Sequence, residues 1–317
     1  MSEQWKVGDL VAAPGAKAAG MQRIRVADHE VEIPVFLING MHHGPTLAVT
    51  AGIHGAEYAS IAAALRIGQT LEPEALHGRV IVAAVANMPA FRARSIYVCP
   101  LDGINLNRVF PGKADGTASE QLAHWLFQNV IRPADYYVDM HGGDLVEALL
   151  PFTIYCDTGN EAVDQRSLEL AQVFGIPHIV RSESRGGTYA SAAIAGIPAI
   201  LTESGGQGIW LPEHVADHVS GLDRLMRHLT ILKGPAPEPV QTQLLKQFAW
   251  LRSEHDGYYY PTIDVGQMVR EGQAIGSVTD FQGAILQSVT APVEGRVLFL
   301  VTSLAINKGD PLLAIGA

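Results

Sequence analysis

Short apolar segments that favour β-strands alternate with helical segments along most of the chain, and this alternation constrains the fold more than any single motif. Strands are predicted at residues 47–53, 79–86, 136–140, 152–156, 177–180 and 198–202. Helices are predicted at residues 56–68, 117–132, 163–174, 187–195 and 212–232. Two earlier strands, at 22–26 and 31–38, are expected to pair antiparallel. The sequence therefore predicts an α/β domain with a mostly parallel or mixed central sheet flanked by helices.

Polar residues stand directly after several of these strands. His54, Asn87, His141 and Glu203 each follow a predicted strand, and glycines lie beside three of them. In α/β sheets, ligands bind in the crevice beyond the carboxyl ends of the strands. We therefore expect these four segments to meet at one cleft.

The residue types at this cleft are those of a metal site. His54, Glu57 and His141 offer two imidazoles and one carboxylate, the ligand set of a catalytic zinc ion with an open position for water. Zinc lowers the pKa of bound water from about 15.7 to about 7, and Glu203 is then the candidate general acid/base. Asp139 is either a partner that orients an imidazole or a simple strand-end carboxylate. The alternative for the H-x-x-E string and for Glu203 is an ordinary helix start.

The segment 92–112 carries three arginines in a turn-rich context within an acidic protein. A guanidinium can hold a carboxylate with two parallel hydrogen bonds, and an arginine near a metal can stabilise an oxyanion. Arg92, Arg94 and Arg108 are therefore candidates for binding an anionic substrate, and surface ion pairs are the alternative for each.

Composition excludes several classes of protein. The 317 residues are 48% hydrophobic and 17% charged, which is typical of a folded chain. A net charge of −10 argues against a nucleic-acid partner. We expect no membrane span and, because the first residues lack a signal-peptide pattern, a cytoplasmic location. Cys99 and Cys156 are interpreted as ordinary thiols.

Four ordered motifs resemble the succinylglutamate desuccinylase and aspartoacylase family, relatives of the zinc carboxypeptidases. They are G-I-H-G-A-E at 52–57, N-L-N-R-V-F-P-G at 105–112, D-M-H-G-G at 139–143 and T-E-S-G-G at 202–206. The resemblance implies one zinc ion per subunit on the two histidines and Glu57, and Glu203 as general acid/base. It also implies that Asn107 and Arg108 hold the substrate carboxylate. A homo-oligomer is a further expectation.

Two features depart from the family pattern. The loop between Arg94, which resembles the oxyanion arginine, and Asn107 is longer than in aspartoacylase, so Arg92 is the alternative for that role. Asn105 stands where the family often has aspartate, and its surroundings resemble bacterial deacetylase members more closely. Arg185 is a candidate contact to the acyl or side-chain group. The sequence identifies neither the acyl group nor the amino acid.

A Pro-rich stretch at 234–239 divides the chain into an expected catalytic domain, 1–235, and a smaller all-β domain, 236–317. The second part resembles a biotinyl/lipoyl-type β-barrel sandwich hybrid, but its hairpin tip at 280–283 lacks the carrier lysine. Tyr258, Tyr259 and Tyr260 are either ordinary strand aromatics or, by the resemblance, residues that reach the active site.

These observations predict a zinc-dependent amidohydrolase that cleaves a small N-acyl amino acid. One alternative is a carboxypeptidase-like metallopeptidase that uses the same site on a short peptide. The other is a non-enzymatic zinc or ligand-binding protein, for which Glu203 and the arginines lack a common purpose.

Overall fold

The central feature of the computed structural model, which describes residues 4–235 and 237–317, is a mixed sheet of nine strands. Their spatial order is β12-β10-β9-β11-β7-β5-β6-β4-β3. In chain order they are β3 (Ala16–Val26), β4 (His29–Asn39), β5 (His42–Ala51), β6 (His77–Ala83), β7 (Tyr136–His141), β9 (Phe152–Cys156), β10 (His178–Ser182), β11 (Ala199–Glu203) and β12 (Gln243–Leu245). The predicted mixed α/β architecture is confirmed.

The parallel and antiparallel pairs occupy different parts of this sheet. Strands β11, β7, β5 and β6 are successive parallel neighbours, and β9, β10 and β12 form a second parallel group. The two groups meet at an antiparallel pair between β11 and β9. β3 and β4 form the predicted antiparallel pair at the other edge, and β1 (Trp5–Val7) and β2 (Leu10–Ala12) form a separate hairpin.

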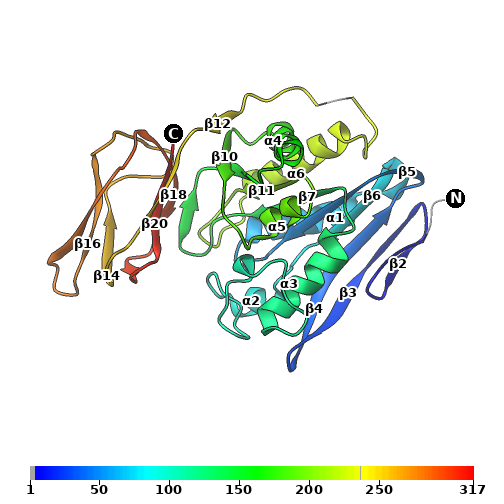
Figure 1. The fold of residues 1–317 in the computed structure, drawn as a ribbon, viewed down its shortest axis with the longest axis horizontal. Coiled ribbons are helices and arrows are strands. Elements are labelled where there is room, and N and C mark those ends of the chain that lie inside the picture. The colour runs from blue at the N-terminus through cyan, green and yellow to red at the C-terminus, as the bar shows by residue number, and fades with distance from the viewer. Residues whose placement is uncertain (1–3, 236) are drawn as a thin grey trace.

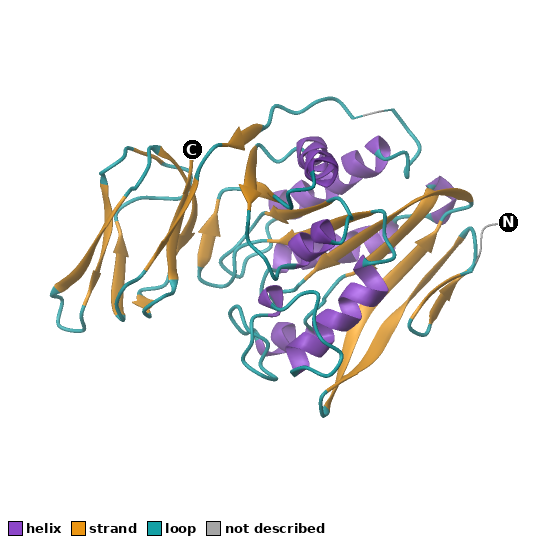
Figure 2. Ribbon diagram, in the orientation of Figure 1, coloured by secondary structure: helices purple, strands orange, loops and turns teal. Residues whose placement is uncertain are grey.

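Helices cover both faces of the sheet (Figures 1 and 2). They are α1 (Tyr58–Thr70), α2 (Met88–Ala93), α3 (Ala118–Leu126), α4 (Glu161–Phe174), α5 (Thr188–Ile194) and α6 (Pro212–His228), with 3-10 turns η1 (Pro73–Ala75) and η2 (Leu106–Arg108) and the π-helical turn η3 (Phe127–Ile131). α1, α4 and α6 pack on one core and α3 and α5 largely on the other. Fully buried leucines such as Leu122 and Leu222 contribute about 1.5 to 3 kcal/mol each.

Local sequence signals explain several helix ends. Thr117 and Glu120 form the predicted capping box at α3, with Glu120 Oε2 accepting the Thr117 N–H at 2.9 Å. The helical segment then continues as η3 to Ile131. Helix α6 ends at His228, earlier than predicted, because Thr230 adopts a left-handed φ of 58°.

The C-terminal part consists of antiparallel sheets at one end of the molecule (Figure 1). One sheet has the order β13-β20-β18-β15 and the other β17-β16-β14-β19. The strands are β13 (Phe248–Arg252), β14 (Gly257–Pro261), β15 (Met268–Val269), β16 (Ala274–Thr279), β17 (Ile285–Thr290), β18 (Gly295–Val301), β19 (Ala305–Ile306) and β20 (Pro311–Gly316). Buried residues of both sheets, including Tyr259, form a common core.

Two short strands connect the α/β part with the C-terminal part. β8 (Glu147–Leu149) pairs with β18 of the C-terminal sheet, whereas β12, which follows the proline-rich stretch, pairs with β10 of the central sheet. Phe152, Val180, Leu245 and Leu298 form a small apolar cluster at this junction. Residue 236, within the predicted linker, lies outside the described residues.

Candidate metal centre and active-site cavity

The carboxyl ends of three adjacent strands bring the predicted metal and acid/base residues to one place. β5, β7 and β11 are neighbours in parallel register, with Ala51 opposite Met140 and His141 opposite Glu203. His54 lies three residues beyond the end of β5, and Glu57 immediately precedes α1. The loop between them packs closely, because a Cβ at Gly55 would lie 2.1 Å from the backbone nitrogen of Phe91.

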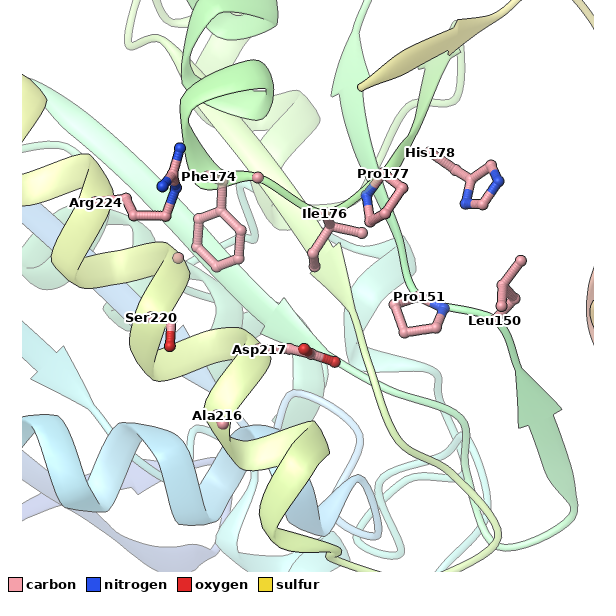
Figure 3. Close-up of a pocket in the computed structure, with 12 residues that line it drawn as sticks. Leu150, Pro151, Phe174, Ile176, Pro177, His178, Ala216, Asp217, Ser220 and Arg224 are labelled. Carbon is pink, nitrogen blue, oxygen red and sulfur yellow. The ribbon is translucent and has the colours of Figure 1, made fainter. Parts of the chain in front are cut away.

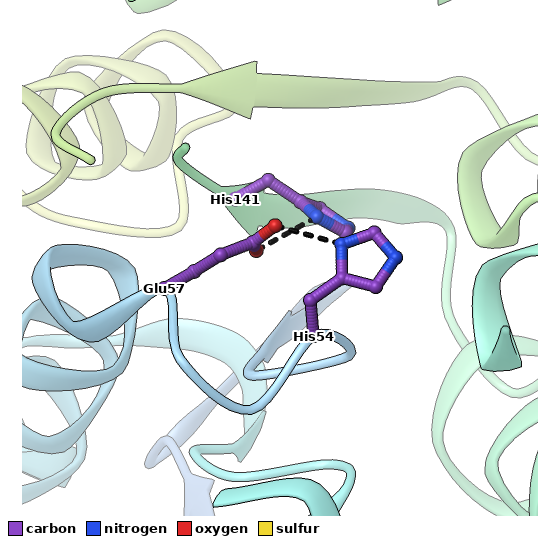
Figure 4. A group of neighbouring side chains, drawn as sticks. All are labelled: His54, Glu57 and His141. Carbon is purple, nitrogen blue, oxygen red and sulfur yellow. Dashed lines mark hydrogen bonds and ion pairs between the residues drawn. The ribbon is translucent and has the colours of Figure 1, made fainter. Parts of the chain in front are cut away.

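Figure 4 shows the side chains of His54, Glu57 and His141 directed toward one another. His54 Nδ1 lies 2.7 Å from Glu57 Oε1, and His141 Nδ1 lies 2.9 Å from Glu57 Oε2. Ligand atoms of the three residues all lie within 4.8 Å of one another. The Glu57 Oε2 atom is buried and has no hydrogen bond of good geometry within the described residues, so it is free to bind an ion. The trio therefore forms a possible metal site.

The outer nitrogen of each imidazole has a hydrogen-bond partner. His141 Nε2 lies 2.8 Å from Asp139 Oδ2, and His54 Nε2 lies 3.1 Å from Asn105 Oδ1. Such partners fix the ring orientation and the tautomer, which leaves Nδ1 of both rings to face the ion. Asp139 is thus positioned as its orienting interpretation requires.

Asn105→Ala is expected to lower zinc affinity or turnover by about 10- to 100-fold, because His54 loses the acceptor that orients its ring. Asn105→Asp keeps an acceptor oxygen and should remain near the wild-type value. Zinc titration of both variants, with the exposed Asn160→Ala as control, measures the effect. Equal affinity in Asn105→Ala and the wild type would remove Asn105 from the site.

The three ligands perturb one another's pKa values. Burial raises the pKa of Glu57, but His141 and His54 lower it more strongly, to about 2. Burial lowers the pKa of His141, but Asp139 and Glu57 raise it well above its usual value. The pKa of His54 also rises, because Glu57 outweighs burial. Glu57 is therefore ionised at neutral pH and offers a cation a buried negative charge.

Glu203 lines the same cavity as the three ligands. Its Oε2 atom is buried and has no hydrogen-bond partner among the described residues. Burial raises the pKa of Glu203 well above its usual value, and the charges of Glu57 and Glu147 raise it further, whereas His141 opposes the shift. A carboxyl group with a raised pKa is suited to carrying and releasing a proton.

The predicted substrate-binding residues also line this cavity, whose volume is 1090 Å³. The Oδ1 atom of buried Asn107 accepts the Thr188 N–H at 3.0 Å, which leaves its amide nitrogen available as a donor. Arg108 is exposed, and its Nη1 donates to the Asn107 carbonyl at 2.8 Å. Arg185 donates to the carbonyls of Glu183 and Asp157, at 2.6 and 2.9 Å.

Some predicted residues do not line the cavity. Arg94 is exposed, ends α2 in a left-handed conformation and is not among the lining residues. Arg92 is exposed and pairs with Glu32 at 3.5 Å. Asn87 instead caps α2 and donates to the Ile53 carbonyl. The oxyanion role of Arg94, with Arg92 as its alternative, stays a prediction.

Strands of the C-terminal sheet supply one wall of the cavity. Phe248, Trp250 and Arg252 from β13 and Phe299 from β18 line it, and Trp250 stacks on Phe299 with ring centroids 4.7 Å apart. Tyr258, Tyr259 and Tyr260 are not among the lining residues. The sequence analysis did not single out these wall residues, nor Tyr97 and Glu147, because only tertiary pairing brings them to the site.

A separate hollow of 310 Å³ lies between α6, the end of α4 and the segment before β10 (Figure 3). Asp217, Arg224 and His178 line it, together with apolar residues such as Phe174. None of the predicted site residues contributes to this hollow. The chemistry predicted from the sequence is therefore confined to the larger cavity.

Comparison with known proteins identifies the family. Residues 43–229 match the succinylglutamate desuccinylase/aspartoacylase catalytic domain family. The chain belongs to this family. Its members are metal-dependent deacylases of N-acyl amino acids. Within the described residues, no helix is long and apolar enough to cross a membrane.

Individual relatives of the aspartoacylase family resemble the chain over most of its length. The N-alpha-acetyl-L-2,4-diaminobutyric acid deacetylase of Halomonas elongata is 32% identical over 273 residues, which cover 84% of this chain and 78% of that protein. A succinylglutamate desuccinylase/aspartoacylase structure from Rhodobacter sphaeroides has a TM-score of 0.85 and 29% identity over 95% of both chains. The product-bound ectoine utilization protein EutE (DoeB) from Ruegeria pomeroyi has a TM-score of 0.84 and 27% identity over the same shares.

Proposed function

We propose that this protein is a zinc-dependent hydrolase that removes the acyl group from a small N-acyl amino acid. The observation that carries this proposal is the convergence of His54, Glu57 and His141, within 4.8 Å of one another, in a cavity that Glu203 also lines. Membership of a deacylase family supports the reaction type. We also propose residues 1–235 as the catalytic domain and 236–317 as the C-terminal domain, each lending one short strand to the other's sheet.

The donor set fits zinc. Two imidazole nitrogens and one carboxylate are the protein ligands of many catalytic zinc sites, and the orphaned Glu57 Oε2 is a further feature that an ion would satisfy. We propose one zinc ion per subunit. When bound, zinc supplies a Lewis acid and lowers the pKa of water from about 15.7 to about 7.

The protein's own residues then have distinct tasks. Glu203 accepts the proton of the attacking water and returns it to the nitrogen of the leaving amine. Arg108 and the amide of Asn107 hold the free carboxylate of the amino acid, and Arg185 contacts the acyl or side-chain group. A role for Arg94 at the oxyanion requires its exposed guanidinium to approach the cavity when substrate binds.

A hydrolysis screen of N-acetyl, N-succinyl and N-formyl amino acids tests this function. We expect the zinc-loaded protein to release free amine from at least one member of this panel. The relative from Halomonas elongata is named for an N-acetyl substrate, which makes the acetyl group the first choice. A parallel panel of dipeptides covers the metallopeptidase alternative. Hydrolysis of dipeptides alone, or of neither panel, would contradict the proposal.

Arg108→Ala is expected to raise KM by about 10- to 100-fold, because a charge-assisted hydrogen bond to a carboxylate contributes about 1.5 to 3 kcal/mol. The matched control is Arg66→Ala on the exposed surface of α1, which should leave KM unchanged. Steady-state kinetics on the substrate found in the screen give both values. An unchanged KM in Arg108→Ala would mean that another residue binds the carboxylate.

A further inference from the structure

The active-site cavity has a second polar wall that the proposed mechanism does not use. Tyr97 from the loop after α2, Glu147 from the start of β8 and Asp310 from the turn before β20 all line it. Glu147 stands opposite Val301 of β18, so this wall lies where the α/β part meets the C-terminal sheet. Two carboxylates and a phenol thus share the cavity with the metal site.

Short hydrogen bonds hold these residues in place. The buried Glu147 accepts the backbone N–H of Asp144 on Oε2 at 2.7 Å and also forms a hydrogen bond with the phenol of Tyr97. Asp144 Oδ2 in turn accepts the backbone N–H of Tyr97 at 2.8 Å. The three residues therefore form a closed ring of contacts.

This ring holds Tyr97 in an uncommon backbone conformation. Tyr97 has a φ of +61°, which is unfavourable for a bulky side chain. Such outliers persist only where surrounding contacts impose them, and they concentrate at functional sites. The structure thus fixes the phenol and the Glu147 carboxylate as a preformed pair at the cavity wall.

The carboxylates of this wall lack a cationic partner. Within residues 4–235 and 237–317, no lysine, arginine or histidine forms an ion pair with Glu147, Asp144 or Asp310. Burial raises the pKa of Glu147 to about 7, against the hydrogen bonds from Asp144 and Tyr97 that lower it. A buried carboxylate is stabilised when a partner supplies a positive charge and hydrogen-bond donors.

The cavity's arginines are differently placed. Arg181 pairs with Asp157 at 2.5 Å, and Arg252 donates to the Gly309 carbonyl at 2.8 Å. Arg185 is held by two backbone carbonyls, which leaves Arg108 with the most unused donors. One free guanidinium suits one substrate carboxylate. The remaining charge at the Glu147 wall is negative and suits a cation.

We propose that the amino acid part of the substrate carries a second, side-chain amino group, and that this ammonium binds Glu147 with help from the Tyr97 hydroxyl and Asp310. This inference rests on the proposed hydrolase function. It makes Glu147 a specificity-determining residue that separates Nα-acyl diamino acids from neutral and acidic N-acyl amino acids. The ammonium has three donors, enough to satisfy both carboxylates and the phenol oxygen.

The test compares kcat/KM for three N-acetyl amino acids with side chains of similar length: L-2,4-diaminobutyrate, L-norvaline and L-glutamate. The wild type should prefer the diaminobutyrate derivative over the norvaline derivative by about 10- to 100-fold, the effect of one charge-assisted hydrogen bond. Glu147→Gln should abolish this preference while leaving norvaline hydrolysis close to the wild-type rate. Tyr97→Phe should weaken it, and the exposed Glu271→Gln, as matched control, should not change it.

Two outcomes overturn the inference without affecting the proposed function. In the first, the wild type hydrolyses all three derivatives equally well. In the second, Glu147→Gln slows the diaminobutyrate and norvaline derivatives by the same factor. Calorimetric binding of free L-2,4-diaminobutyrate and L-norvaline to the zinc-loaded protein gives a readout that does not depend on turnover. Equal affinity of the wild type for both amino acids would also overturn it, whereas failure to hydrolyse any derivative contradicts the proposed function.

Discussion

Glu203→Gln lowers kcat by about 10²- to 10⁴-fold, the usual contribution of a positioned general acid/base. Glutamine keeps the shape of the side chain, so the central sheet and the metal site remain intact, but its amide cannot shuttle a proton between water and the leaving amine. Single-turnover and steady-state kinetics at equal zinc content measure the loss.

The matched control for this variant is Glu161→Gln, an exposed change in the first turn of α4 that should leave kcat unchanged. A folded Glu203→Gln protein with near-wild-type turnover would show that another group handles the proton. Glu147, whose pKa is raised to about 7 in the same cavity, would then be the next residue to examine.

Removal of the metal by a chelator abolishes hydrolysis to the background of the assay, and added zinc restores it. Magnesium does not, because two of the three ligands are imidazoles and magnesium prefers oxygen ligands. The fold survives, since the sheet is held by apolar cores on both faces.

Circular dichroism of the chelated protein should therefore match that of the zinc-loaded form, with a lower Tm. A ligand at 100 times its Kd stabilises the folded state by about 2.7 kcal/mol, so the difference in Tm should be measurable. Full activity in protein shown by elemental analysis to be metal-free would contradict the metal-dependent mechanism.

The sequence predicts the architecture well because its signals are local. Alternating apolar runs mark the strands and helices, and Thr117 with Glu120 marks the start of α3 before any tertiary contact is known. The convergence of His54, His141 and Glu203 also follows from a general rule, since parallel neighbouring strands end at the same edge of a sheet.

The remaining features depend on long-range pairing that local patterns do not encode. β12 crosses back to the central sheet and β8 joins the C-terminal sheet, so the two parts are joined by strand pairing as well as by a linker. For the same reason Trp250 and Glu147 reach the cavity from segments that show no motif. Asn105 looked like a departure from the family pattern, yet its oxygen contacts the outer nitrogen of His54.

The most direct test of the account is the zinc content of the protein purified without chelator, beside His54→Ala and His141→Ala. Both histidines contribute ligand atoms to the cluster with Glu57, so we expect about one zinc per wild-type chain and a strongly reduced content in each variant. Elemental analysis of folded, gel-filtered protein gives these numbers. Wild-type protein that binds no zinc even after zinc is added, or variants that retain as much as the wild type, would contradict the assignment of the metal centre.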